Sequence, residues 1–345
     1  MRTDAMPPMA RRTFRIALVA ALSLVVAYGL ATPLPFIAPI FALFLTATPA
    51  PPMGPKPLLG LLLVVALTLG IGLVLSPILR HYPVTGVLLV AAGLFLSTFI
   101  GVGKGKGAVS TLLAVGLTMI PAAALIEHAA ALSIVQALLT GIVVAIACQW
   151  LVYPLLPEDA VAAKKPAAQV MAAPEAAWIA LRTMLIVLPP VLMAFTNPAA
   201  YMAIIMKAVL LGQQGSLVQA RAAGRELLGS TFLAGIFAIV LWLGLQAWPG
   251  LWMFFLLSLL LGVGLGGKLY GAFPTRFPPS FWLNTGVTVL ILVGPAVADS
   301  SGGGERAAFV QRFLLFVAVT LYAWLAIVVL ERLRAALAAR SMQAT

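Results

Sequence analysis

Long apolar runs are the feature that most constrains what this chain can fold into. They recur along all 345 residues, and most reach the roughly 20 residues that an α-helix needs to cross a bilayer. Lipid offers the backbone no hydrogen-bond partner, so runs of this length are stable there as helices. The chain is 63% hydrophobic and 9% charged, whereas roughly 25% charged residues is usual in soluble domains. The sequence therefore predicts an all-α integral membrane protein.

The spacing of charge, Pro and Gly predicts about twelve transmembrane segments, six in each half. They fall at about residues 14–31, 35–47, 57–79, 84–102, 108–126, 131–156, 176–195, 199–213, 228–248, 250–271, 280–297 and 306–334. The second and eighth segments are shorter than the roughly 20 residues of a full crossing. Whether these two span the membrane is left open by the sequence.

The two halves resemble each other at an offset of about 165 residues. "RTFRIALVAALSLVVAYGLATPLPFIAPIF" and "ALRTMLIVLPPVLMAFTNPAAYMAIIM" share a basic start, a long apolar run, a Pro turn and a short apolar element. Six crossings per half make these parallel repeats, related by an axis along the membrane normal. We therefore expect a first six-helix repeat at 1–156, a cytoplasmic linker at 157–175 and a second six-helix repeat at 176–345.

The net charge of +12 is explained by membrane topology. Cytoplasmic loops collect Lys and Arg. With the N-terminus inside and Lys207 set aside, only Arg80, Arg306 and Arg312 of the other 20 basic residues, counted from the 21 Lys and Arg of the chain, fall in outer loops. This asymmetry predicts a multi-pass protein with both termini cytoplasmic, and the positive charge needs no nucleic-acid partner.

Lys207, in the stretch "MAIIMKAVLLGQQG", is the best candidate for a binding residue. If the outer boundary lies near Asn197, Lys207 is about 15 Å deep in a roughly 30 Å core. Such a position costs at least about 2.5 kcal/mol unless the ammonium faces protein or water. We expect an anion site there, with Lys207 offsetting a substrate carboxylate. The residues proposed with it are Tyr201, Met202, Met206, Gln213 and Gln214. The alternative is that the helix breaks at Gly212 and Lys207 snorkels to the surface.

The remaining candidates for chemistry are few. Glu127 and His128 are adjacent in an outer loop and could form a proton or ion pathway, because histidine changes charge near neutral pH; solvated loop residues are the alternative. The chain has only two histidines and one cysteine, Cys148, which is too few to suggest a Cys/His metal cluster. The glycines of "GVGKGKG" do not match a nucleotide-binding loop. The sequence thus predicts no catalytic residue, no metal and no cofactor.

The N-terminal stretch carries a family resemblance. The basic start at Arg12 and Arg15, the small-and-aliphatic first segment and "PLPFIAPIF", Pro33 to Phe41, resemble the fusaric acid resistance and aromatic acid exporter-like proteins of Gram-negative bacteria. The six-helix halves extend this resemblance over nearly the whole chain. The linker and tail leave no room for the cytoplasmic domain of many relatives, so the resemblance is to a compact branch without one.

The resemblance implies an inner-membrane secondary exporter of aromatic or other hydrophobic organic acids, acting as the membrane component of an efflux system. The implied partners are a haemolysin-secretion-type periplasmic adaptor and an outer-membrane channel, besides the organic-anion substrate, membrane lipids and a second copy of the chain in a homo-oligomer. Two alternatives stay open. One is a non-transporting assembly or scaffold subunit, and the other is a membrane enzyme acting on a lipid-linked substrate, for which the sequence offers only Glu127 and His128.

Overall fold

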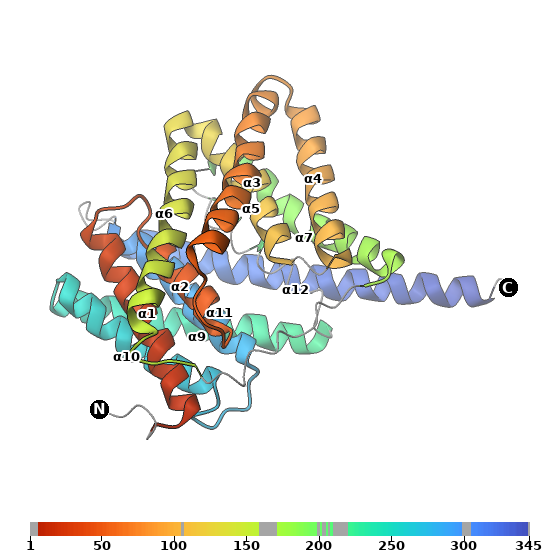
Figure 1. Ribbon diagram of the computed structural model, residues 1–345. Coiled ribbons are helices and arrows are strands. Elements are labelled where there is room, and N and C mark those ends of the chain that lie inside the picture. The colour runs from red at the N-terminus through yellow and green to blue at the C-terminus, as the bar shows by residue number, and fades with distance from the viewer. Residues whose placement is uncertain are drawn as a thin grey trace. The chain divides into compact units, whose positions relative to one another are not determined.

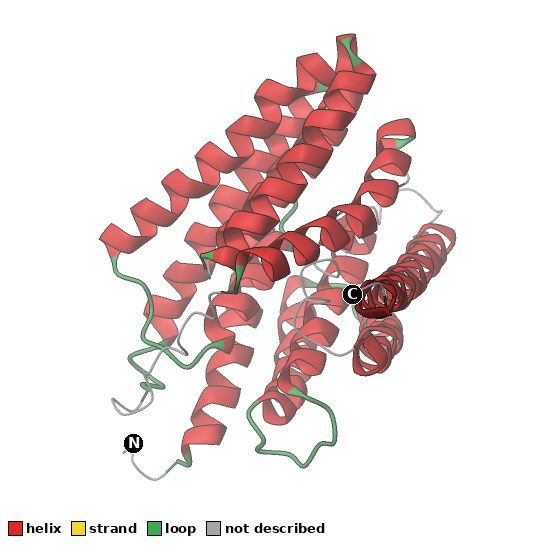
Figure 2. Ribbon diagram, turned by 90° about the vertical axis from the view of Figure 1, so that its right-hand side faces the viewer, coloured by secondary structure: helices red, strands yellow, loops and turns green. Residues whose placement is uncertain are grey.

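Helices make up the regular structure of the chain (Figures 1 and 2). The structure is a computed structural model that describes residues 6–104, 107–158, 171–198, 201, 205, 208–209, 220–298 and 305–343. These residues form eleven helices and no strand. The helices are α1 (Pro8–Gly29), α2 (Ile37–Ala47), α3 (Pro55–His81), α4 (Pro83–Gly103), α5 (Gly107–Ile126), α6 (His128–Val152), α7 (Ala173–Thr196), α9 (Ala220–Ala247), α10 (Leu251–Leu269), α11 (Pro279–Ala298) and α12 (Glu305–Gln343).

Within the described part of the chain, nine helices are long and apolar enough to cross a membrane. The protein is therefore an α-helical multi-pass membrane protein, as the sequence predicts. The predicted short second segment corresponds to α2, whose 11 residues span roughly 16 Å, about half of a hydrocarbon core. Within α5, Ser110–Ile126 is an apolar helix shorter than the nine, although α5 as a whole has 20 residues. Most of the predicted eighth segment, 199–213, lies outside the described residues.

The chain divides into two compact units that do not follow the order of the sequence. Unit 1 comprises the described residues of Met1–Leu63, Ser133–Pro166 and Gly229–Phe313, and unit 2 those of Val64–Leu132, Ala167–Leu228 and Leu314–Thr345. Unit 1 thus contains α1, α2, α10 and α11 with most of α6 and α9. Unit 2 contains α4, α5 and α7 with most of α3 and α12. Each unit takes helices from both of the predicted six-helix halves.

In unit 1, α1 is the central contact element because small residues let neighbouring helices approach it. A side chain added at Gly262 of α10 would lie 2.9 Å from the Ala17 Cα, and one added at Gly266 would lie 2.8 Å from Ile16 Cγ2. Close approach through small residues is the usual basis of helix packing in lipid, where apolar side chains gain little by leaving the solvent. The opposite side of α1 packs on α2 and α6 through Val19, Ala42 and Ala145.

A strained turn joins α1 to α2. Ala31 and Leu34 adopt left-handed backbone angles, with φ of 50° and 47°, which non-glycine residues rarely do. Hydrogen bonds hold this turn: Thr32 Oγ1 donates to the Ala27 carbonyl at 3.1 Å, and the Tyr28 hydroxyl donates to the Gly294 carbonyl at 3.1 Å. The turn fixes where α2 enters unit 1, and therefore which residues of α2 face α10 and α11.

In unit 2, α3 and α5 cross at glycines. A side chain added at Gly72 would overlap the Gly116 carbonyl oxygen, and one added at Gly116 would overlap the Thr68 carbonyl oxygen. Helix α4 continues from α3 after a short turn (Figure 1) and packs on α5 and α7. A second apolar cluster joins α7 to α12 through Ile186, Val319 and Ala323. The sequence pattern of small residues every four positions is what permits these crossings.

Candidate functional site

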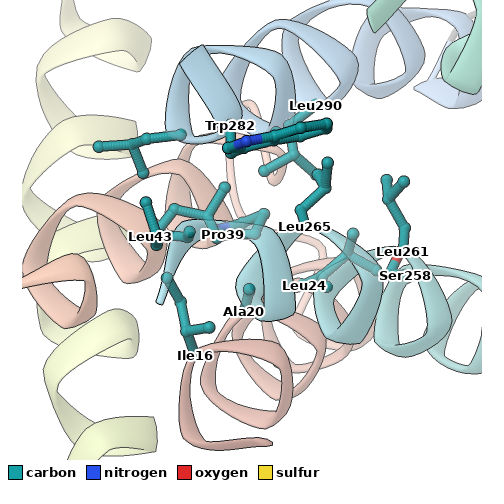
Figure 3. Close-up of a pocket in the computed structure, with 15 residues that line it drawn as sticks. Ile16, Ala20, Leu24, Pro39, Leu43, Ser258, Leu261, Leu265, Trp282 and Leu290 are labelled. Carbon is teal, nitrogen blue, oxygen red and sulfur yellow. The ribbon is translucent and has the colours of Figure 1, made fainter. Parts of the chain in front are cut away.

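Unit 1 contains an apolar pocket between α1, α2, α10 and α11 (Figure 3). We call it the Ser258 pocket. Its lining residues are Ile16, Ala20, Leu24, Pro39, Leu43, Ser258, Leu261, Gly262, Leu265, Gly266, Leu269, Trp282, Leu283, Gly286 and Leu290. Helical periodicity produces this wall, because residues four apart, such as Ile16, Ala20 and Leu24, share one helix face. The cavity volume of the pocket is about 40 Å³, below the roughly 300–1,000 Å³ of small-molecule sites, so a ligand of that size would bind only as the lining side chains move apart.

One hydroxyl interrupts the apolar lining. The Oγ atom of Ser258 is shielded from solvent and has no hydrogen-bond partner. The indole of Trp282 closes the pocket on the side of α11, across from Ile16 and Ala20 (Figure 3), and its own Nε1 donates to Thr275 Oγ1 at 3.1 Å. A shielded hydroxyl without a partner costs free energy, so Ser258 is the group in this pocket that a polar ligand atom would satisfy.

A cation lies beside the same tryptophan. The Lys268 Nζ atom is 5.9 Å from the centroid of the Trp282 ring and donates to the Pro274 carbonyl at 2.7 Å. Lys268 ends α10, and an ammonium there is favoured by the negative end of the helix dipole. An aromatic face, a cation and an apolar pocket thus meet at one end of unit 1.

A buried charge cluster lies at the start of α1. It consists of Arg12, Arg15, Tyr153 and Glu158, and we call it the Glu158 cluster. Both arginines form ion pairs with the Glu158 carboxylate, and the side chains of Arg15 and Glu158 are only 3% and 6% exposed. The Arg15 guanidinium also lies over the Tyr153 ring, 5.7 Å from its centroid. Arg15 is therefore neutralised by a carboxylate that follows α6.

The two arginines control the ionisation of Glu158. Burial alone raises the pKa of a carboxyl group, but the hydrogen bonds and positive charges from Arg12 and Arg15 outweigh it and hold the pKa of Glu158 below its ordinary value. Glu158 is therefore a fixed negative charge at neutral pH. The cluster ties the segment after α6 to α1 and satisfies a guanidinium that would otherwise be buried unpaired.

Polar side chains also finish the short helix α2. The Tyr270 hydroxyl lies 3.0 Å from both the Thr46 and Ala47 carbonyl oxygens, which are among the last carbonyls of α2 and have no helical partner. Gln149 Nε2 donates to Thr46 Oγ1 at 2.8 Å. These hydrogen bonds satisfy polar groups that the short helix leaves without an intrahelical partner.

Unit 2 carries a comparable charge pair. Arg182 of α7, with a side chain 6% exposed, pairs with Glu331 of α12. Trp178 Nε1 donates to the same carboxylate at 3.2 Å, and the Arg334 guanidinium lies 5.3 Å from the centroid of a Trp178 ring. In each unit, an arginine of the first helix of a predicted half therefore pairs with a distant glutamate, Glu158 in the predicted linker and Glu331 within α12.

The residues predicted from the sequence are mostly not placed. Lys207, Met202, Met206, Gln213 and Gln214 lie outside the described residues. Tyr201 is half-buried and packs against the apolar cluster of α7 and α12. Glu127 and His128 are exposed at the junction of α5 and α6. No group of three or more metal-ligating side chains occurs in the part of the chain that the structure describes.

Sequence reasoning missed the Ser258 pocket and both charge clusters. From the sequence, Arg12, Arg15 and Arg182 are expected among the cytoplasmic basic residues, and Glu158 in the linker. One signal was available: Arg15 adjoins a long apolar run in "RTFRIAL", and Arg182 lies within the predicted apolar segment 176–195, in "ALRTMLI". A cation that continues directly into such a run needs a partner. The spacing does not identify that partner, because it lies about 140 or more residues away.

Comparison with known proteins adds one finding. Residues 12–152, from α1 to the end of α6, match the sequence model of a family described as "Protein of unknown function (DUF2955)". No curated protein and no solved structure shows significant similarity to the chain.

Proposed function

We propose that the protein is a secondary exporter of aromatic or other hydrophobic organic acids. The observation that carries this proposal is the Ser258 pocket, an apolar cavity between membrane helices whose polar group is one unpartnered hydroxyl. An aromatic acid has the complementary composition, a flat apolar body with one anionic end. The resemblance of the N-terminal stretch to fusaric acid resistance and aromatic acid exporter-like proteins supports the same substrate class.

In this proposal the pocket binds the apolar body and the polar groups hold the carboxylate. Leu24, Leu265 and the Trp282 ring would contact the aromatic ring. The Ser258 hydroxyl would donate to a carboxylate oxygen, and a hydrogen bond to a charged group contributes about 1.5–3 kcal/mol. Lys207, with Gln213 and Gln214, remains the proposed cationic site of the second half.

The location and partners are part of the proposal. The charge asymmetry supports a bacterial inner-membrane protein with both termini cytoplasmic. The starts of α1, α7 and α11 and the end of α10 would then face the cytoplasm, so the Glu158 cluster and Lys268 would lie on that side. A periplasmic adaptor and an outer-membrane channel would complete the efflux route, as the resemblance implies.

The paired charges are a loose parallel between the two predicted halves. Arg15 of α1 and Arg182 of α7 are two residues out of register at the 165-residue offset, and each pairs with a glutamate far along the chain, Glu158 after α6 and Glu331 within α12. The helices are also distributed reciprocally. Unit 1 combines α1, α2 and most of α6 from the first half with α10, α11 and most of α9 from the second. Unit 2 combines α4, α5 and most of α3 from the first half with α7 and most of α12 from the second, as far as it is described.

The fluorescence of Trp282 gives a direct test of the pocket. Purified protein is titrated with 1-naphthoate, and the tryptophan emission is compared with that of a Trp282→Phe variant, because the chain has 7 tryptophans. We expect saturable quenching that disappears in Trp282→Phe. Ser258→Ala should bind the acid about tenfold more weakly, the ratio that corresponds to one lost charged hydrogen bond.

A matched serine controls for loss of a hydroxyl alone. Ser76 of α3 donates to the Gly72 carbonyl at 2.9 Å within its own helix, so Ser76→Ala should bind 1-naphthoate like the wild type. If the wild type shows no saturable quenching, or if Ser258→Ala and Trp282→Phe respond like the wild type, the pocket is not the site and the proposal fails.

A further inference from the structure

A second cavity of unit 1 lies on the other side of α10, between α9 and α10. We call it the α9–α10 groove. Its walls include Leu233, Phe237 and Leu241 of α9 and Leu257, Gly264 and Lys268 of α10. Its empty volume, including the part open to the outside, is about 1010 Å³. Leu261, Leu265 and Trp282 line both this groove and the Ser258 pocket, so the two cavities are neighbours.

The groove has the length of one lipid leaflet. From Leu257 to Lys268, α10 rises roughly 16 Å, which is about half of a roughly 30 Å hydrocarbon core. Its rim faces outward from unit 1, because Leu260 and Val240 are 71% and 60% exposed. Gly264 leaves open space within the groove, since an added Cβ would meet no atom within 4 Å. An extended apolar chain could therefore enter from the side and lie along α10.

One end of the groove is cationic. Lys268 has three N–H donors, of which one contacts the Pro274 carbonyl. In the described part of the chain, no carboxylate forms an ion pair with Lys268. The adjoining loop adds the exposed Arg276, and Trp282 has the aromatic character that is enriched at the level of lipid headgroups. The charge of the site is thus complementary to an anion, and its position matches a phosphate at the membrane surface.

We propose that the α9–α10 groove binds an anionic phospholipid, with one acyl chain along α10 and the headgroup phosphate at Lys268. Basic sites between membrane helices are known to recognise anionic headgroups in this way. An aromatic acid would contact only the end of a groove this long, whereas an acyl chain would fill it. The proposal does not depend on the transport function, because the phosphate would bind at Lys268, which lines the groove and not the Ser258 pocket.

Lipid binding by the delipidated protein tests this assignment. Dioleoyl phosphatidylglycerol and dioleoyl phosphatidylcholine are titrated separately into the full-length protein in detergent, and bound lipid is counted by native mass spectrometry. We expect one preferred phosphatidylglycerol site in the wild type. Lys268→Gln should weaken phosphatidylglycerol binding at that site about fivefold and leave phosphatidylcholine unchanged, as expected for one lysine at a membrane surface. Lys268→Arg should retain the preference.

Two matched substitutions separate the groove from general effects. Gly264→Leu fills the groove and should reduce binding of both lipids, whereas Gly70→Leu makes the same change at a helical glycine of α3 with equally open surroundings and should not. Lys56→Gln removes an exposed lysine at the start of α3 and should also bind like the wild type. Lys268→Gln adds no bulk, so it keeps the test informative if Gly264→Leu does not fold.

Three results would overturn the assignment. In the first, Lys268→Gln and Gly264→Leu bind phosphatidylglycerol like the wild type. In the second, glycerol phosphate competes as well as phosphatidylglycerol, so that the acyl chain contributes nothing. In the third, bound lipid is lost at the same 1-naphthoate concentrations at which the acid itself binds, and the groove is then part of the organic-acid site. The naphthoate titration of Trp282 and Ser258 variants is scored separately, so failure here leaves the proposed function intact.

Discussion

At the scale of single residues, the Glu158 cluster is the strongest electrostatic feature of unit 1. Arg15 is buried beside α6, and Glu158 neutralises it from the segment that follows this helix. A buried ion pair adds little net stability compared with apolar residues, but removal of one partner leaves a buried charge without compensation. Arg15, near the start of α1, can therefore be buried only when residues 153–158 are in place to neutralise it.

Replacement of Glu158 should destabilise the protein strongly. We expect Glu158→Gln to lower the free energy of unfolding by on the order of 3 kcal/mol, because Arg15 loses its charge partner in a buried site. Glu331→Gln should cost less, about 1 kcal/mol, since the Glu331 side chain is 33% exposed and water can replace part of the interaction. Chemical unfolding in mixed micelles measures both. Equal effects of the two substitutions would contradict this account of burial.

The same carboxylate determines a pH dependence. Because Arg12 and Arg15 lower the pKa of Glu158 from its ordinary 4.5, the stability that Glu158 contributes is complete above about pH 4.5. It is lost as the pH falls through the lowered pKa. Unfolding followed between pH 7 and pH 3 should show an acid limb in the wild type, and this limb should be shallower in Glu158→Gln.

At the scale of helices, the crossing of α3 and α5 depends on two glycines. Gly72→Ala should destabilise unit 2 by at least about 2 kcal/mol, because the new methyl group would overlap the Gly116 carbonyl and force the helices apart. Gly70 lies two residues earlier in α3, and the methyl group of Gly70→Ala would meet no atom within 4 Å. This substitution should stabilise the helix by about 0.5–1 kcal/mol. Thermal unfolding of the two variants measures the contrast, and a Gly72→Ala protein as stable as Gly70→Ala would exclude the close crossing.

The helices themselves could be predicted well from the sequence. The run at about 84–102 corresponds to α4, Pro83–Gly103, and the run at about 57–79 to α3, Pro55–His81, because hydropathy reports directly on lipid exposure. Helix α12 extends to Gln343, past the predicted end near 334, since a helix can continue beyond its apolar run into polar surroundings. Hydropathy gives the ends of the apolar run, not the ends of the helix.

The grouping of the helices and the site could not be predicted in the same way. Apolar periodicity does not say which helices pack together, because all of them have lipid as an alternative solvent. Ser258 is one hydroxyl within "MFFLLSLLLG" and becomes a candidate only when its lack of a partner is known. The sequence prediction centred on Lys207, a cation within an apolar run, and its role stays a prediction.

At the scale of the whole molecule, the reciprocal composition of the two units is the main result. Each unit combines helices of both predicted halves and buries an arginine–glutamate pair of its own. Duplication followed by exchange of the middle helices would produce this pattern. The Ser258 pocket and the α9–α10 groove both belong to unit 1, and the candidate site around Lys207 belongs to the second half. The Ser258 pocket is lined by α1 and α2 of the first predicted half and by α10 and α11 of the second, so we expect that substrate binding and transport need residues from both halves.

Transport by purified protein in liposomes is the most direct test of the exporter proposal. Uptake of 1-naphthoate is measured under proton, sodium and potassium gradients for wild type, Ser258→Phe, Lys207→Ala and Lys207→Arg. We predict gradient-driven uptake by the wild type, its loss when phenylalanine fills the pocket or alanine replaces Lys207, and partial activity with arginine. If the wild type moves no organic acid under any of these gradients and binds none, the protein is not an exporter of this class.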